Sequence, residues 1–323
     1  QQGKVIAMSI KDRGSALPGG HYSDGSYWYD SNTGTFMTST YYMNKLPDWM
    51  VKFNNRKLAD QYLNQTWNTS KAISEYTESG VDNSPYEGGF KGKDTPTFPY
   101  DLSKLRKENG NFGMLPSTPF GNTLLNELAL AAIDAEGLGA DAITDFLAVS
   151  FSSPDYIGHN FGPQSKEVQD TYIRLDNEIE RLLNALDSKV GKGNYVVFLT
   201  ADHAVAENSK RMKDDKFKVD NFNSSGYNKY LKAAVNEKYG EAEWFEGSMG
   251  YDVFLDHDVV AEKKVDLYEL QLFVAQQAMK FDGVHLALTA TDLARNSYSE
   301  QMRSLMQNSY HTKESGDVKI ILN

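Results

Sequence analysis

The chain has 323 residues, a formal net charge of −11 and no cysteine. The lack of cysteine excludes disulfides, thiolate metal sites and cysteine nucleophiles. The acidic balance argues against a nucleic-acid-binding scaffold, which normally carries a basic face. Apolar residues make up 40% of the chain, as is typical of a globular protein. No apolar run approaches the roughly 20 residues of a membrane span.

The first third of the chain predicts short elements and one long irregular region. Residues 5–10 predict a buried strand, and the glycine-rich residues 14–25 predict a loop. Asn32-Thr33-Gly34 lies between two apolar runs and predicts a hairpin. Leu46-Pro47-Asp48 predicts the start of a helix, because proline and aspartate suit a first helical turn. Residues 69–120 are polar and rich in Gly, Pro and Ser, which indicates a long surface excursion.

The middle of the chain alternates between helical and strand patterns. Apolar spacing predicts helices over residues 124–136 and 168–186. Nearly continuous apolar runs predict strands at 146–151 and 195–200 that are covered on both faces. A strand, a helix and a strand at this spacing predict a right-handed crossover and a parallel pair in one sheet.

The last third changes in character. From about residue 208 the pattern predicts helices near 227–235 and 267–279, an alternating strand at 252–260 and a final strand at 317–322. We therefore predict one α/β domain, an α/β/α sandwich, over residues 1–323. Within it, residues 208–300 are predicted to form a smaller α+β insertion.

Two acidic and two histidine residues follow the two strands of the predicted crossover. Asp155 and His159 follow the first strand, and Asp202 and His203 follow the second. Parallel neighbours would bring all four to the carboxyl edge of the sheet, where open α/β sheets bind ligands. Carboxylate and imidazole ligands suit zinc or a similar divalent ion, and two such ions can clamp a phosphoryl group. Taken singly, an Asp-x-x-x-His spacing usually arises by chance, and an Asp-His pair at a strand end is more often a helix cap or a turn.

Two cationic residues follow the first predicted strand. Lys11 and Arg13 would point the same way from an extended segment and form a two-pronged anion site. Arginine suits bidentate contact with phosphate, and lysine acts as a point charge. The alternative is a solvated strand end.

Several segments together resemble a known family. Residues 145–163 and 200–203 resemble the alkaline phosphatase superfamily. Residues 9–14, 28–30 and 118–123 narrow the resemblance to bacterial alkaline phosphatases of the PafA type. The similarity extends along the whole chain.

The resemblance implies a two-zinc phosphomonoesterase that works through a phosphoenzyme on a threonine. Asp155 and His159 would bind the first zinc, and Asp202 and His203 would bind the second. Lys11 and Arg13 would hold the phosphate oxygens. The implied substrates are small phosphate monoesters, with no nucleic acid or membrane as a partner. The implied location is periplasmic or secreted.

The resemblance also implies parts that this chain lacks. In that family the nucleophilic threonine, one aspartate ligand and a phosphate-contacting asparagine precede the Lys-Asp-Arg segment, and none of the residues before Lys11 fits those roles. A third ligand of the first zinc, a histidine, would follow Asn323. We therefore expect a chain truncated at both ends and nearly inactive alone.

Three alternatives remain open on the sequence. The first is a nucleotide pyrophosphatase/phosphodiesterase of the same superfamily. The second is a sulfatase with a serine-derived nucleophile, since only the cysteine-derived type is excluded. The third is a non-catalytic remnant domain that kept the fold.

Overall fold

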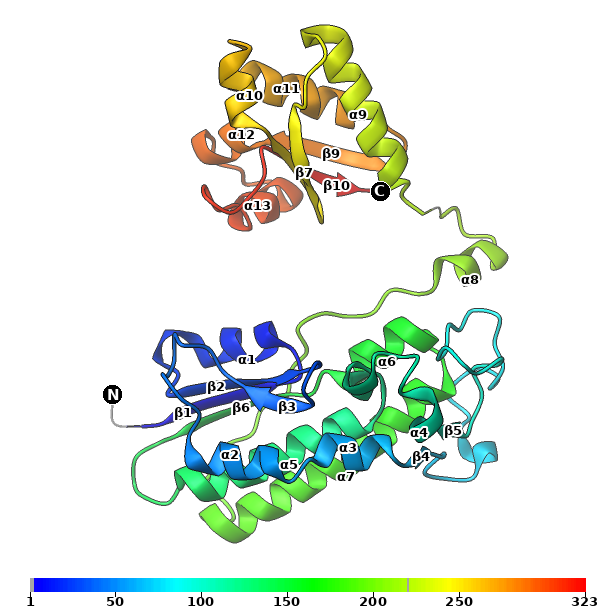
Figure 1. Ribbon diagram of the computed structural model, residues 1–323, viewed down its shortest axis with the longest axis vertical. Coiled ribbons are helices and arrows are strands. Elements are labelled where there is room, and N and C mark those ends of the chain that lie inside the picture. Colours follow the sequence, from blue (N-terminus) through cyan, green and yellow to red (C-terminus); the bar gives the residue numbers. More distant parts are fainter. Residues whose placement is uncertain (1–2, 220) are drawn as a thin grey trace. The chain divides into compact units, whose positions relative to one another are not determined.

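A computed structural model describes residues 3–219 and 221–323 of the chain. Contacts divide the chain into two units, Gln1–Asp215 and Lys216–Asn323 (Figure 1). The predicted limits of the insertion, 208–300, stay a prediction.

The first unit is built on a four-stranded sheet in the order β3-β2-β1-β6. Strands β1 (Val5–Ser9), β2 (Gly25–Asp30) and β6 (Phe146–Ser150) run parallel, and β3 (Thr35–Met37) is antiparallel to β2. The predicted strand at 5–10 and the predicted hairpin are therefore confirmed. The middle of β1 is fully buried because its residues are apolar on both faces.

Helices cover both faces of this sheet (Figure 1). Helix α1 (Asp12–Gly19) lies on one face, and α2 (Asp48–Asn55) and α5 (Phe120–Glu136) lie on the other. The remaining elements of the unit are short helices and strands, the long helix α7 and several tight turns. They are α3 (Leu58–Leu63), β4 (Thr66–Trp67), β5 (Tyr100–Asp101), α4 (Leu102–Leu105), α6 (Ser153–Phe161), α7 (Lys166–Leu186), α8 (Ser209–Asp214), 3₁₀ turns at Gly20–Tyr22, Ile73–Glu75 and Asn111–Ser117, and a π turn at Asp187–Gly191.

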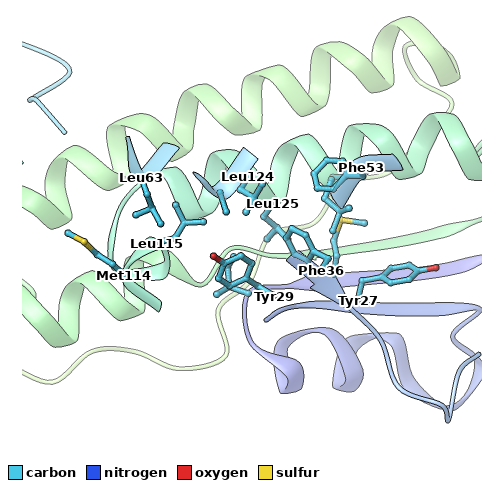
Figure 2. Close-up of a cluster of buried hydrophobic side chains, with 14 of the residues drawn as sticks. Tyr27, Tyr29, Phe36, Phe53, Leu63, Met114, Leu115, Leu124 and Leu125 are labelled. Carbon is cyan, nitrogen blue, oxygen red and sulfur yellow. The ribbon is translucent and has the colours of Figure 1, made fainter. Parts of the chain in front are cut away.

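A single apolar core joins the sheet to the helices on its second face. Aromatic side chains from β2 and β3 meet apolar side chains from α2, α3, α5 and the turn before α5 (Figure 2). The labelled residues are Tyr27, Tyr29, Phe36, Phe53, Leu63, Met114, Leu115, Leu124 and Leu125. Their rings pack edge to face, which is the favoured geometry for aromatic pairs.

Three predictions for this unit are wrong. Residues 14–19 belong to helix α1 and residues 20–22 form a 3₁₀ turn, so most of the predicted loop is helical. Residues 195–200 form no strand in the described chain, and Val196 and Leu199 are more than four-fifths exposed. The expected parallel pair with β6 is therefore absent from the described residues. An apolar run becomes a strand only where a neighbouring strand satisfies its backbone groups. Strand β6 therefore lies at the edge of the sheet, where no further strand covers it, and it is only partly buried.

The predicted surface excursion, residues 69–120, is partly a core segment. Phe90, Tyr100 and Leu102 are at most 5% exposed, and Tyr100 packs against Phe161 of α6 at 5.5 Å between ring centroids. Glycine, proline and serine gave this segment the composition of a loop, but its sparse aromatic residues bury enough apolar area to hold it in place.

The second unit is an antiparallel sheet with helices. Its strand order is β7-β8-β10-β9, and helix α11 packs on the sheet and against α9. The elements are α9 (Ser224–Tyr239), β7 (Phe245–Met249), β8 (Asp252–Leu255), α10 (His257–Glu262), α11 (Leu267–Ala278), β9 (Val284–Thr289), α12 (Ala290–Arg295), α13 (Gln301–Asn308) and β10 (Val318–Leu322). Both predicted helices and the final strand are confirmed.

The strand predicted at 252–260 ends early, at Leu255. Asp256 accepts a hydrogen bond from Val259 N and begins helix α10. The buried Asp317 carboxylate accepts hydrogen bonds from Leu255 N, His257 Nε2 and Gln271 Nε2 at 2.8–2.9 Å. This carboxylate joins β8, α10, α11 and β10, and His257 belongs to that structural contact.

None of the helices in residues 3–219 and 221–323 combines the length and apolar character that crossing a bilayer requires.

An acidic cluster lies where residues 82–100 pack on α7. We use this name for Asp82, Glu87 and Glu167. Burial raises the pKa of Glu87 to about 8, and the charge of Glu167 adds to the shift. Burial also raises the pKa of Glu167 to about 7, although the hydroxyl of Tyr100 donates to its Oε1 at 2.5 Å. Within the described residues, Asp82 Oδ1 and Glu167 Oε2 are buried without a hydrogen-bond partner.

The acidic cluster predicts a pH-dependent stability. Folding raises both pKa values above the ordinary 4.5, so the unfolded chain loses these protons first as the pH rises. The contribution is intact below about pH 4.5 and is lost as the pH rises towards about 8. Urea unfolding across this range should show a smaller decrease in unfolding free energy for Glu87→Gln than for the unchanged protein. Glu180→Gln, an exposed change on α7, should behave as the unchanged protein does. Equal pH profiles for all three would contradict the prediction.

Candidate active site

The parallel pairing of β1 and β6 sets the position of the candidate site. The register aligns Val5 with Phe146 and Ser9 with Ser150, so both strands end at the same edge of the sheet. Ligands bind outside this carboxyl edge in α/β proteins. The segments that follow the two strands, Lys11 to Arg13 and Ser152 to His159, therefore start side by side.

A hydrogen bond between two buried serines joins these two segments. Ser9 Oγ lies 3.0 Å from Ser152 Oγ in a hydrogen bond, and it accepts a bond from Lys11 N at 3.1 Å. Helix α1 then packs closely on the same point through Gly14. A Cβ atom at Gly14 would lie 2.5 Å from Ser9 Oγ and 2.9 Å from Ser150 Oγ. These serines could not be singled out from the sequence, since serine is common at strand ends.

Lys11 and Asp155 form an ion pair at the centre of the site. Lys11 Nζ donates to Asp155 Oδ2 at 2.5 Å, and each side chain is 24% exposed. The ammonium also lies 5.1 Å from the ring centroid of Tyr156, a cation–π distance. Lys11 and Asp155 were predicted as parts of two separate motifs, and the structure brings them into contact.

Both predicted histidines face the other oxygen of Asp155. His159 Nε2 lies 3.3 Å from Asp155 Oδ1, one helical turn along α6. His203 Nε2 lies 3.8 Å from the same oxygen and 3.5 Å from Asp202 Oδ2. The four predicted metal ligands thus form a continuous chain of contacts. Asp155 is the sheltered member, and the other three are largely exposed.

The electrostatics favour an ionised Asp155. Burial opposes ionisation of this carboxyl, but the hydrogen bond and charge of Lys11, with smaller contributions from His159 and His203, hold its pKa below the ordinary value. An ionised carboxylate is the form that can ligate a metal.

The described residues do not display a finished metal site. Within residues 3–219 and 221–323, no three His, Asp or Glu side chains are arranged to hold one ion together. The types of donor nevertheless suit zinc, because Asp155 Oδ1 has an imidazole nitrogen of His159 at 3.3 Å and one of His203 at 3.8 Å. The other carboxylate oxygen, Asp155 Oδ2, accepts a hydrogen bond from the ammonium of Lys11.

The geometric basis predicted for the Lys11 and Arg13 pair is wrong. Lys11 has an extended conformation, but Arg13 lies in the first turn of α1 rather than in an extended segment. The Arg13 side chain is 76% exposed, and its Nη1 lies 3.8 Å from Asp12 Oδ1. The two side chains therefore do not converge as alternate residues of a strand would.

A cavity of about 480 Å³ adjoins the site, and the sequence did not reveal it. Tyr156, His159 and Asn160 of α6 line one part of it, and the side chains of Lys91 and Glu108 line another. The cavity depends on the path of residues 89–114, which composition alone did not predict. It places polar and aromatic groups beside His159.

Comparisons with known proteins identify the family and agree with this fold. The family model for type I phosphodiesterase / nucleotide pyrophosphatase matches residues 16–321. The chain is 43% identical over 319 residues to alkaline phosphatase PafA of Elizabethkingia meningoseptica, covering 98% of this chain and 58% of the relative. It is 41% identical over 327 residues to alkaline phosphatase PhoV of Synechococcus elongatus, covering 99% of this chain and 57% of the relative.

A solved structure has the same fold over the whole length of this chain. The crystal structure of wild-type alkaline phosphatase PafA matches with a TM-score of 0.90 and 42% identity, over 100% of this chain and 61% of that chain. This likeness confirms the predicted fold class. The chain spans between 57% and 61% of the length of these relatives.

The close packing at Gly14 yields a prediction about stability. Gly14→Ala should lower the free energy of unfolding by about 1–3 kcal/mol, because the added methyl group crowds the hydroxyl groups of Ser9, which is buried, and Ser150. Gly158→Ala in α6 is the matched control, since a Cβ there meets no atom within 4 Å. That change should be neutral or stabilising by up to about 1 kcal/mol. Urea unfolding measures both, and equal stability of the two variants would contradict the prediction.

Proposed function

Because the chain belongs to the type I phosphodiesterase / nucleotide pyrophosphatase family, we propose that it forms part of an enzyme that hydrolyses phosphate monoesters at a two-zinc site. The observation that carries the proposal is the environment of Asp155. Its carboxylate has a lysine ammonium on one oxygen and two imidazoles near the other. The names of the two relatives, both alkaline phosphatases, support the same activity.

In this proposal Asp155 and His159 would hold one zinc ion, and Asp202 and His203 would hold the second. Metal ions bound there would stabilise the attacking and leaving oxygens of a phosphoryl transfer. The contact between His203 and Asp155 supports a shared site, since it joins the two pairs across 3.8 Å.

Lys11 and Arg13 are the proposed phosphate-binding residues. Lys11 already lies at the site, and Arg13 is an exposed guanidinium two residues away. Rotation about the long arginine side chain would direct its fork towards a phosphate, where it can form two parallel bonds. Hydrolysis through a phosphoenzyme belongs to the proposal, with the nucleophile outside the residues assigned here.

The proposed substrates are small phosphate monoesters, whose organic part would occupy the cavity beside Tyr156 and His159. The net charge of −11 supports a small anionic substrate held by local cations rather than a nucleic acid. The proposed location is periplasmic or secreted, because the chain resembles bacterial alkaline phosphatases. Cell fractionation can test this location.

A second candidate is cleavage of phosphate diesters, because the matching family model describes phosphodiesterases and nucleotide pyrophosphatases. The two activities differ in the charge that the site must hold. A monoester carries one more negative charge than a diester, so a second cation favours it. A remnant domain without activity would hydrolyse neither ester.

Arg13 should distinguish these candidates. In the full-length protein, Arg13→Ala should lower kcat/KM for an aryl phosphate monoester about ten- to a hundredfold, as expected for loss of a charged hydrogen bond worth about 1.5–3 kcal/mol. A diester of the same alcohol should lose much less. Arg303→Ala, on the surface of the second unit, is the control and should leave both rates unchanged. Equal losses for both esters would contradict monoester specificity.

This chain alone should bind zinc weakly and turn over little substrate. Two protein ligands for each ion fall short of the three that catalytic zinc sites usually have. Calorimetric titration of the chain with zinc, in a buffer without phosphate, measures the affinity directly. Tight binding of two ions would contradict this expectation and would indicate ligands that we have not assigned.

A further inference from the structure

The segment that carries His203 has little regular structure of its own. Within the described chain, residues 201–208 belong to no helix or strand, and residues 201–206 are exposed. The His203 ring forms a hydrogen bond of 2.9 Å with the carbonyl of the adjacent Ala204, which cannot fix the segment against the sheet. The distance of 3.8 Å between His203 and Asp155 therefore depends on the elements that anchor this segment.

Helix α8 follows this segment and packs on the loop around Tyr86. The Tyr86 hydroxyl donates to Asp214 Oδ2 at 3.0 Å. The ammonium of Lys210 and the guanidinium carbon of Arg211 each lie 5.9 Å from the centre of the Tyr86 ring, within the range of a cation–π interaction. Just before the helix, Asn208 Nδ2 donates to Tyr86 O at 3.2 Å. The ring, the hydroxyl and the backbone of Tyr86 thus all contact α8 or the residue that precedes it.

Helix α8 needs such contacts because it is short. It has six residues, and isolated helices of fewer than about 12 residues are marginal in water. Asn208 Oδ1 caps it by accepting bonds from Lys210 N at 2.9 Å and Arg211 N at 3.4 Å. This cap favours the helix but does not attach it to the rest of the protein. Tyr86 supplies an attachment, so loss of its side chain should free both the helix and the segment before it.

The same loop, residues 84–88, is also bonded to α6, the helix that carries Asp155. Gly88 N donates to Asn160 O at 2.9 Å, and a Cβ atom at Gly88 would collide with that oxygen. In the turn after α6, Gln164 Nε2 donates to the carboxylate of Glu207. The loop around Tyr86 therefore contacts both α6 and the segment that carries His203.

We propose that Tyr86 is a positioning residue, which holds His203 beside Asp155 by docking helix α8 on the loop 84–88. The inference rests on the proposed function, because that function gives His203 and Asp155 their role. Tyr86 acts through α8 and Asn208 rather than by contact with substrate. It lies in the segment whose composition predicted a surface excursion, so the sequence gave no indication of this role.

Displacement of His203 should slow turnover more than it weakens substrate binding. A shift of about 1 Å in a group at a reaction site can lower the rate by up to about a hundredfold. Lys11 and Arg13, which are proposed to hold the phosphate, lie at the start of α1 in a different part of the unit. The kcat should therefore fall more than the KM rises.

Kinetics of the full-length protein test this separation. Tyr86→Ala should lower kcat for an aryl phosphate monoester about tenfold or more, while KM changes by less than about threefold. Tyr86→Phe keeps the ring beside its two cations, so kcat should fall by no more than about threefold. Tyr268→Ala is the matched control, because the Tyr268 hydroxyl donates to Asp292 Oδ1 at 2.9 Å in the second unit. It removes a similar tyrosine–aspartate bond and should leave kcat and KM unchanged.

Hydrogen exchange measures the docking of α8 in the same protein without substrate. Backbone amides of residues 210–215 should exchange about tenfold faster or more in Tyr86→Ala than in the unchanged protein, because an undocked helix of this length unfolds. Amides of α7 should exchange equally in both proteins. Exchange in α8 should also be unchanged in Tyr268→Ala.

The possible outcomes separate the inference from the proposed function. Unchanged exchange in α8 of Tyr86→Ala overturns the inference, since docking then does not depend on Tyr86. Faster exchange with unchanged kcat overturns it as well, because the helix then does not set a position that catalysis uses. Either result leaves the proposed function standing if the unchanged protein hydrolyses the ester. If the unchanged full-length protein hydrolyses no phosphate ester, the proposed function fails and the inference fails with it.

Discussion

The register of β1 against β6 is the constraint on which the candidate site depends. Alignment of Ser9 with Ser150 brings the two following segments to one edge of the sheet, and a buried serine pair holds them there. A shift of one residue would turn alternate side chains to the opposite face. It would separate Lys11 from Asp155, so the electrostatics of the site follow from the backbone pairing.

Much of this arrangement can be predicted from the sequence, because strand ends and apolar runs are local features. The strands at 5–10 and 146–151 were predicted correctly. The Lys11–Asp155 ion pair could not be predicted, since the register between strands 140 residues apart depends on how the whole sheet assembles. The resemblance supplied residue types for a site but no contacts between them.

The wrong predictions share one physical cause, which is that tertiary packing outweighed local composition. Gly14 indicated a loop, yet its lack of a side chain lets helix α1 pack against Ser9 and Ser150. Residues 69–120 also read as loop, yet their aromatic residues are buried. Residues 195–200 had the pattern of a buried strand, but β sheet forms only between partners, and this run has none among the described residues.

The contact with Asp155 offers a reason why residue 11 is a lysine rather than an arginine. An arginine there could form two parallel bonds to the carboxylate and would engage both of its oxygens. Lysine forms a point contact, so it pairs with one oxygen of the carboxylate while the imidazoles of His159 and His203 lie near the other. Arginine stands at position 13 instead, in an exposed turn where nothing holds its guanidinium against Asp155. Under the proposed function, Lys11 lies against the carboxylate proposed to bind metal, and the exposed guanidinium of Arg13, which is suited to bidentate contact, can reach a phosphate.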